Sequence, residues 1–120
     1  MNKRNISIIG GAGHVGFPLG LIFSSKGFKV SLIDKDKKNI KKINNGEIPF
    51  LEEHSKKLLS SMIKKGKIYA TDQINEISKS KYIIICIGTP ITNQLNPNLK
   101  PFLNFFHNLK TKIKKDQIII

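Results

Sequence analysis

Short apolar runs alternate with longer amphipathic segments along the chain. The apolar runs are rich in β-branched residues and are bounded by glycine or charged residues, which predicts strands at about 6–9, 28–33, 67–70, 82–87 and 117–120. Apolar positions at helical spacing predict helices at about 15–26, 36–44, 52–65 and 73–78, and from residue 98 onwards. Strands that alternate with helices predict an α/β fold with a parallel, doubly wound sheet.

Two of the predicted helices lead to specific expectations about burial. The first has an apolar stripe at spacing i, i+4, i+7 and i+8, formed by Val15, Leu19, Ile22 and Phe23, and we expect it to pack on the sheet. In the last helix we expect burial of Leu99, Phe102, Leu103, Phe106 and Ile113. Because the chain stops inside the last predicted strand, we expect one domain over residues 1–120 that is truncated within about its fifth strand.

A glycine-rich turn joins the first predicted strand to the first predicted helix. The motif Gly11-x-Gly13-x-x-Gly16 follows an apolar strand, opens a helix and precedes a second strand that ends in an acid, which is the context of a Rossmann-type dinucleotide-binding motif. In such a motif Gly11 permits the tight turn, Gly13 lets a pyrophosphate approach the backbone, and Gly16 lets the helix pack closely. A glycine-rich turn without a ligand is the alternative.

Two polar residues at the carboxyl ends of strands complete the expected cofactor site. Asp34 lies 18 residues after Gly16, where a carboxylate accepts hydrogen bonds from ribose hydroxyls and repels a 2′-phosphate, so NAD is favoured over NADP. A helix-capping role is the alternative for Asp34, and Lys35 would soften the exclusion of NADP. Thr89 follows the strand at 82–87, and we expect it to contact the cofactor ribose or phosphates; satisfying a local turn is its alternative role.

The charge of the chain suggests nucleic-acid binding as a different function, because a formal net charge of +13 is typical of proteins that bind nucleic acids. However, Arg4 is the only arginine and the lysines are spread along the sequence, so we favour a solvated basic surface and expect no nucleic-acid partner. Binding of nucleic acid remains an alternative. The apolar runs are shorter than the about 20 residues that a membrane span needs. The chain has one cysteine and no signal-peptide core, so we expect no membrane partner and a cytoplasmic location.

The sequence offers no recognisable catalytic group. Cys86 lies in an apolar strand, where we expect a buried and poorly ionised thiol. The three histidines, His14, His54 and His107, share no metal-ligand spacing with one another or with Cys86. We therefore predict neither a catalytic residue nor a metal site within these 120 residues.

The motifs, taken in order, resemble the N-terminal NAD-binding domain of the UDP-glucose/GDP-mannose dehydrogenase family over essentially the whole chain. The matching segments are Gly10-Gly11-Ala12-Gly13-His14-Val15-Gly16-Phe17-Pro18-Leu19, Ile33-Asp34, Gly46-Glu47-Ile48-Pro49-Phe50-Leu51-Glu52 and Ile83-Ile84-Ile85-Cys86-Ile87-Gly88-Thr89-Pro90. The combination of the glycine turn with the Gly-x-x-Pro segment and a strand ending in Gly-Thr-Pro is far more specific than the turn alone.

The resemblance implies NAD as cofactor and the four-electron oxidation of a nucleotide-sugar C6 hydroxyl, most simply of a UDP-sugar, to a carboxylate. In the family this reaction uses two NAD, passes through a cysteine thiohemiacetal and a thioester, and supplies polysaccharide precursors. By resemblance the pyrophosphate turn would comprise Gly11, Gly13, His14, Val15 and Gly16. Asp34 would hold the adenosine ribose and Thr89 would contact the cofactor. His14 departs from the tyrosine common in the family, and Asn39 from its lysine or arginine.

The resemblance also implies that the rest of the enzyme lies beyond this segment. The family's Ser-Thr-Val-x-Pro-Gly-Thr segment, its following glutamate and the lysine, asparagine and cysteine of its catalytic centre would all follow Ile120. We therefore expect these 120 residues alone to be inactive, the nucleotide sugar to bind through the missing domains, and the full-length protein to form a homo-oligomer. A stand-alone, non-catalytic NAD-binding module or remnant is the alternative.

Overall fold

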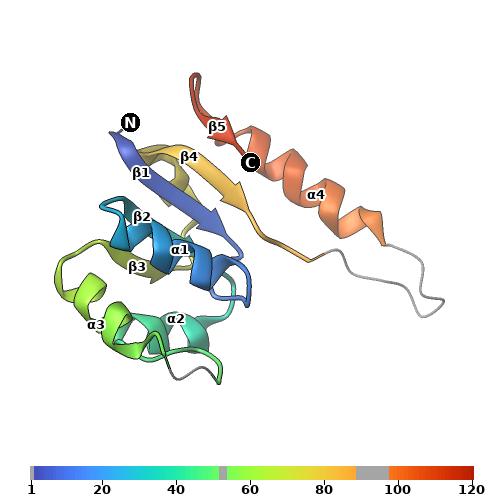
Figure 1. Cartoon of the computed structure of the whole chain (residues 1–120). Coiled ribbons are helices and arrows are strands. Elements are labelled where there is room, and N and C mark those ends of the chain that lie inside the picture. Colours follow the sequence, from blue (N-terminus) through green and yellow to red (C-terminus); the bar gives the residue numbers. More distant parts are fainter. Residues whose placement is uncertain (1, 52–53, 89–97) are drawn as a thin grey trace.

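The computed structural model describes residues 2–51, 54–88 and 98–120. Its strands form one five-stranded sheet in the order β3-β2-β1-β4-β5 (Figure 1), and all four neighbouring pairs are parallel. The strands are β1 (Asn2–Ile9), β2 (Lys29–Ile33), β3 (Ile68–Thr71), β4 (Ser80–Ile85) and β5 (Ile118–Ile119). The predicted order of elements and the parallel sheet are confirmed.

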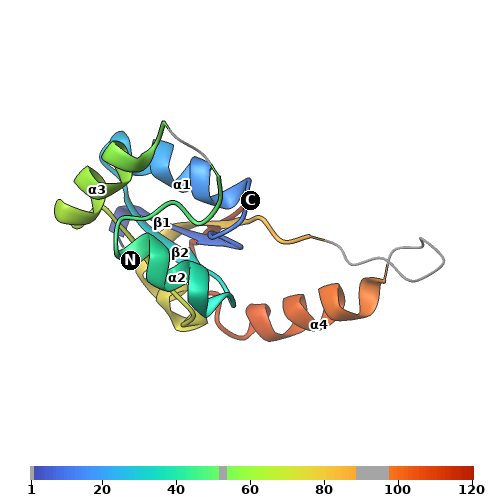
Figure 2. The ribbon, with the colours of Figure 1, turned by 90° about the horizontal axis from the view of Figure 1, so that it is seen from below.

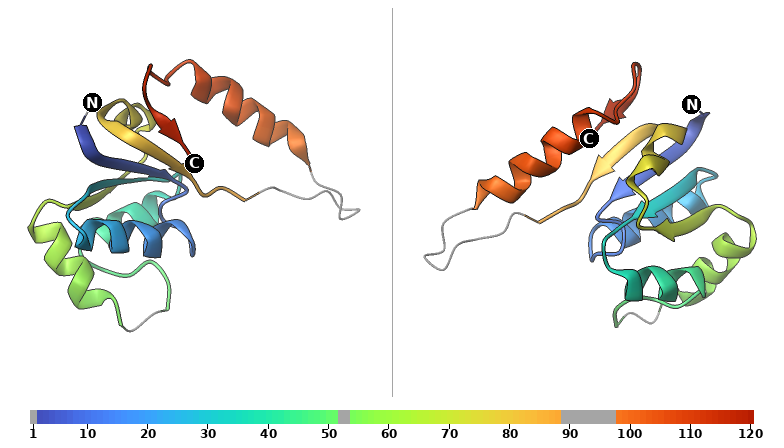
Figure 3. Two further views of the ribbon diagram at one scale, coloured as in Figure 1. Left: turned by 45° about the horizontal axis from the view of Figure 1, so that its top comes forward. Right: turned by 180° about the vertical axis from the view of Figure 1, so that it is seen from behind.

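Helices cover both faces of this sheet (Figures 2 and 3). They are α1 (Gly16–Ser25), α2 (Lys37–Asn44), α3 (Lys56–Lys64), the 3-10 helix η1 (Ile74–Lys79) and α4 (Leu99–Lys110). The helices α1, α2 and α3 pack on one face, whereas η1 and α4 pack on the other, which is the predicted doubly wound, Rossmann-type arrangement. Within the described ranges, the helices are too short or too polar to span a lipid bilayer.

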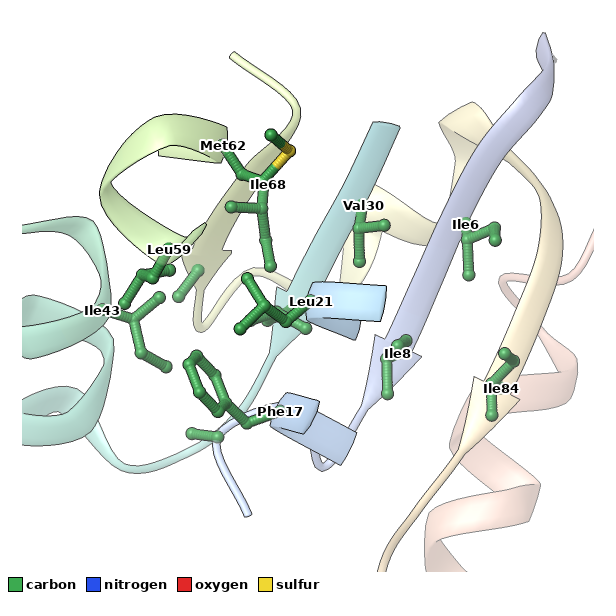
Figure 4. Packing of buried hydrophobic residues seen from close by; sticks show 13 residues of the cluster. Ile6, Ile8, Phe17, Leu21, Val30, Ile43, Leu59, Met62, Ile68 and Ile84 are labelled. Carbon is green, nitrogen blue, oxygen red and sulfur yellow. The ribbon is translucent and has the colours of Figure 1, made fainter. Parts of the chain in front are cut away.

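The two faces have separate apolar cores because successive strand residues point to opposite sides. Ile8 of β1 is buried in the larger cluster, while its neighbour Ile9 belongs to the smaller one. Figure 4 shows the larger cluster, which draws side chains from β1, β2, β3 and β4 and from α1, α2 and α3: Ile6, Ile8, Phe17, Leu21, Val30, Ile43, Leu59, Met62, Ile68 and Ile84. Each fully buried side chain of this kind contributes about 1.5–3 kcal/mol to folding.

The predicted packing face of α1 is wrong for two of its four residues. Leu19 and Phe23 pack, half-buried, against the larger cluster, whereas Val15 is 69% exposed and Ile22 is 56% exposed. The buried residues of α1 instead are Gly16, Phe17, Gly20, Leu21 and Ser24. Small residues at spacing i, i+4 and i+8 let the helix axis approach the sheet closely, and Phe17 and Leu21 fill the space beside them. A helix that is apolar on most of its surface has no single stripe that the sequence can identify.

The predicted burial of the last helix is wrong at Leu99 and Leu103, whereas Phe102, Phe106 and Ile113 are half-buried. Leu109 is its one buried residue, whereas Leu99 is 54% exposed and Leu103 is 52% exposed. Phe106 packs against the smaller cluster but remains half-buried. The helix runs beside the β4–β5 edge of the sheet, and its amino-terminal half extends beyond it (Figure 1). The spacing of apolar residues predicted a helix here. The burial of each residue depends on how much of the sheet lies beneath it.

A buried polar network ties η1 to the sheet. The hydroxyl of Ser7 in β1 lies 2.7 Å from the hydroxyls of both Ser31 and Ser80. Nearby, the hydroxyl of Tyr69 donates to Glu76 of η1 at 2.5 Å, and Lys79 donates to the same carboxylate at 3.0 Å. These bonds from Tyr69 and Lys79 lower the pKa of the Glu76 carboxyl. Burial and the neighbouring carboxylate raise the pKa of Tyr69 to about 12.

We expect this tyrosine to make stability depend on alkaline pH. Below pH 10 the phenol is protonated in both states and its stabilisation is fully present. Between pH 10 and about 12 the unfolded chain releases a proton that folded Tyr69 retains, so the free energy of unfolding falls. Urea unfolding of wild type and Y69F at a series of pH values from 8 to 12 measures this. Because the lysines titrate in both proteins, only their difference reports Tyr69, and a difference that does not change with pH would contradict the assignment.

Candidate cofactor site

The candidate site lies where the strands of the sheet end. Ile9 at the end of β1 is in register with Ile33 of β2 and with Ile85 of β4, so these three carboxyl ends form one edge. The chain turns from β1 to β2 and β3 on one side and later crosses to β4 on the other. The crevice between β1 and β4 is therefore the topological switch point, where open α/β sheets bind their ligands.

The glycine turn is anchored to this edge by backbone hydrogen bonds. The amides of Gly10 and Gly11 donate to the carbonyl of Ile33 at 2.8 and 3.1 Å. The motif predicted that Gly11 permits the tight turn. In the structure the residue with a conformation that favours glycine is Gly10, whose φ is +81°. Gly11 is needed for a different reason, because a Cβ there would lie 2.7 Å from the Cα of Leu32.

The other two glycines of the motif have contrasting surroundings. A Cβ on Gly13 would meet no atom closer than the carbonyl oxygen of Gly10 at 3.5 Å, so the space beside Gly13 is open. A Cβ on Gly16 would lie 2.4 Å from that same oxygen and 3.0 Å from the Cα of Gly11. The fold therefore requires glycine at position 16, whereas position 13 leaves room for an approaching ligand.

The start of α1 presents the backbone amide of Gly16 at the end of the glycine turn. The amides of Phe17 and Leu19 already donate, to Gly13 at 3.0 Å and to Val15 at 3.3 Å, and Pro18 has no N–H. Val15 is the N-cap residue, and its side chain makes no capping hydrogen bond. The first turn contains no acidic residue. The first amide of a helix has no intrahelical acceptor, and the helix dipole places partial positive charge there. With His14 and Val15 exposed beside it, this terminus has the chemistry of a diphosphate-binding site.

Asp34 faces the glycine turn across the edge of the sheet. Its Oδ2 accepts a hydrogen bond from the amide of Ala12 at 3.0 Å, and its Oδ1 accepts one from the amide of Asp36 at 3.0 Å. The cap of α2 is Asp36, whose Oδ1 accepts from the amide of Asn39 at 3.1 Å. The capping alternative thus belongs to Asp36, and Asp34 is held beside the turn, half-buried, with exposed Lys35 next to it.

A residue to which sequence reasoning gave no role also belongs to this region. Phe50, in the loop between α2 and α3, stacks on His14 with ring centroids 4.3 Å apart and ring planes 32° apart. Its ring also meets Phe17 edge to face, with centroids 5.7 Å apart and planes at 89°. The family resemblance implies that the segment from Pro49 to Glu52 is a loop near the cofactor, but nothing in the local sequence indicates a contact with residues more than 30 positions earlier.

The remaining predicted residues add little to the site. Thr89 lies outside the described residues. Cys86 comes directly after β4 and is half-buried rather than inside a buried strand as expected; burial raises the pKa of its thiol. Among the described residues, no group of three histidine, cysteine or acidic side chains could hold a metal ion. A cavity of about 460 Å³ lies at the opposite, amino-terminal edge of the sheet, beside Tyr69 and Glu76, and is distinct from the glycine turn.

The chain is similar to nucleotide-sugar dehydrogenases in sequence and in fold. The chain is 33% identical over 89 residues to UDP-N-acetyl-D-mannosamine dehydrogenase of Pyrococcus horikoshii, covering 74% of this chain and 21% of the relative. The solved structure of UDP-D-ManNAc dehydrogenase from that organism superposes with a TM-score of 0.84 at 26% identity, over 96% of this chain and 27% of the other. GDP-mannose dehydrogenase from Pseudomonas aeruginosa, solved as a ternary complex, gives 0.82 at 26% identity, over 92% and 25%.

The chain thus spans about a fifth to a quarter of the length of the proteins that it matches. The family model for the NAD-binding domain of the UDP-glucose/GDP-mannose dehydrogenases matches residues 4–120, which includes the glycine turn, Asp34 and Phe50. The chain is therefore an NAD-binding domain of the UDP-glucose/GDP-mannose dehydrogenase family.

Proposed function

We propose that this chain is the cofactor-binding part of an NAD-dependent dehydrogenase that oxidises the C6 hydroxyl of a nucleotide sugar, a UDP-sugar, to a carboxylate for polysaccharide precursor synthesis. The observation that carries the proposal is the pairing of Asp34 with the glycine turn through the amide of Ala12, within a chain that matches the family's NAD-binding domain. The UDP-sugar is supported by the Pyrococcus relative, whose name specifies such a substrate.

The residues of this chain bind and orient the cofactor. The adenosine ribose hydroxyls would donate to the carboxylate of Asp34, and the diphosphate would accept hydrogen bonds from the amides of His14, Val15 and Gly16. Bound NAD supplies the acceptor for hydride from the substrate. Because the nicotinamide must reach toward the substrate, the open edge between β1 and β4 is where a substrate-binding part of the enzyme would face this domain.

The catalytic groups are proposed to lie in chain that follows this segment, and the 120 residues alone are expected to be inactive. The enzyme would act in the cytoplasm as a homo-oligomer, without a nucleic-acid or membrane partner. If the basic surface binds no nucleic acid, adding nucleic acid should change the affinity for NAD little. Salt-sensitive nucleic-acid binding without competition from NAD would favour the alternative function.

The coding sequence beyond the codon for Ile120 tests the proposed activity directly. An in-frame continuation into Ser-Thr-x-x-Pro-Gly-Thr and a later cysteine would support the dehydrogenase, and purified full-length protein should then reduce NAD with a UDP-sugar. A stop codon at that point would leave a stand-alone NAD-binding module, and the dehydrogenase activity would have to be withdrawn.

A further inference from the structure

The contact between Phe50 and His14 lies where the glycine turn enters α1. The amide of Gly13 donates to the carbonyl of Gly10 over 3.3 Å, and a Cβ on Gly13 would have no close neighbour. Val15 caps α1 without a side-chain hydrogen bond. Position 14, between these two residues, is exposed, so its stacking on Phe50 is a side-chain contact that can restrain this part of the turn.

Phe50 is itself fixed to the core. Its edge-to-face partner Phe17 is a buried member of the larger apolar cluster, and Phe50 packs against the same cluster. The loop that carries it is anchored where it leaves α2, since the amide of Gly46 donates to Ile43 at 2.9 Å and that of Glu47 donates to Lys42 at 2.8 Å. The ring of Phe50 therefore connects His14 to the buried core and can restrict the motion of its side chain.

We propose that Phe50 is a positioning residue for the dinucleotide. By stacking on His14 it holds the amides at the start of α1 in the arrangement that receives the diphosphate. Phe50 thereby forms one wall of the cofactor site. This inference rests on the proposed binding of NAD at the glycine turn. It concerns the aromatic contact and not the charge of the imidazole, since stacking requires only a flat ring at position 14.

The chain contains a matched control for the loss of such a contact. Phe28 meets Phe23 edge to face, with centroids 5.8 Å apart and planes at 77°, at the other end of α1. Phe28 is half-buried against the same cluster as Phe50. The variants F50L and F28L therefore each remove one aromatic ring from the same core, but only F50L changes the contact with the glycine turn.

Two measurements on the full chain test the inference. In isothermal titration calorimetry we expect F50L and H14A each to bind NAD about three- to tenfold more weakly than wild type, the range that an aromatic pair supplies. H14F keeps a ring at position 14 and should recover part of the affinity that H14A loses. F28L should stay within twofold of wild type, and the double variant H14A/F50L should lose little beyond either single change. Without cofactor, hydrogen exchange of the Phe17 amide, which donates to the carbonyl of Gly13, should be faster in F50L than in F28L.

Wild-type affinity for NAD in F50L would overturn the inference. An equal loss of affinity in F28L would also overturn it, because the effect would then reflect general destabilisation. H14F binding as weakly as H14A would also overturn it, since the imidazole itself would then carry the effect. Failure of wild type to bind NAD would instead remove the proposed function. The exchange measurement still decides in that case whether Phe50 restrains the turn, so the two failures are distinguishable.

Discussion

Alanine at Gly13 is expected to abolish measurable NAD binding while the domain stays folded. The nearest atom to a Cβ at this position lies 3.5 Å away, which is an ordinary contact. The substitution should therefore lower the free energy of unfolding only slightly. The methyl group would, however, occupy the space through which the diphosphate approaches the backbone. We expect at least about a 100-fold loss of affinity, equivalent to about 2.7 kcal/mol, with the urea midpoint nearly unchanged. Calorimetric titration and urea unfolding of G13A measure the two effects separately.

The matched variant is G16A, in the same motif. Its Cβ would lie 2.4 Å from the carbonyl oxygen of Gly10, a backbone atom that is fixed by the end of β1. Overpacking of this kind costs about 3 kcal/mol, so G16A should be strongly destabilised and should lose NAD binding because it unfolds. If G13A were destabilised as much as G16A, or if it bound NAD normally, the division of roles between these two glycines would be wrong.

The sequence was sufficient to predict the fold because strong local signals agreed with one another. The glycine turn, the β-branched run of β4 and the capped helix α2, with Asp36 at its start, each indicate one type of element. Their order leaves a parallel, doubly wound sheet as the arrangement that covers every apolar face. The elements lie where the pattern placed them, with boundaries that differ by a few residues, as at α3, which begins at Lys56.

The burial of individual helix positions could not be predicted in the same way. In α1 the choice of face depends on close approach at Gly16 and Gly20, which becomes visible only against the strands beneath. In α4, Leu103 satisfies the helical pattern but remains 52% exposed, in a hollow that Ile119 of β5 also lines. Periodicity records which residues are apolar, whereas burial is decided by neighbours that are distant in the sequence.

For the cofactor site, the sequence identified the residues whose spacing is local and missed contacts that span the fold. The motif placed Gly11, Gly13 and Gly16 in one turn and Asp34 at the end of the next strand, and the structure brings this carboxylate to the turn through the amide of Ala12. Phe50 reaches the turn from a loop after α2, and no spacing rule connects it with His14.

Replacing Asp34 by asparagine is expected to change the choice of cofactor. In the proposed binding mode the carboxylate of Asp34 would accept hydrogen bonds from the ribose hydroxyls and would repel a 2′-phosphate, so NAD should bind more tightly than NADP. Hydrogen bonds to a charged acceptor contribute about 1.5–3 kcal/mol, so D34N should weaken NAD about 10- to 100-fold. The affinity for NADP should be retained or improved, because the repulsion is removed while exposed Lys35 remains. Titration of both proteins with both cofactors measures the ratio.

The control for this change is D36N, which removes the same charge two residues away. Asp36 caps α2 by accepting a hydrogen bond from the amide of Asn39, and asparagine is an equally good N-cap. Its carboxylate makes no hydrogen bond to the glycine turn, whereas that of Asp34 bonds to Ala12. D36N should therefore keep the preference for NAD, since a loss of general negative potential is screened at this exposed position. A wild-type preference for NADP would contradict the role of Asp34 at the ribose. The same shift in D36N as in D34N would also contradict it, because the choice of cofactor would then depend on net charge and not on one oriented carboxylate.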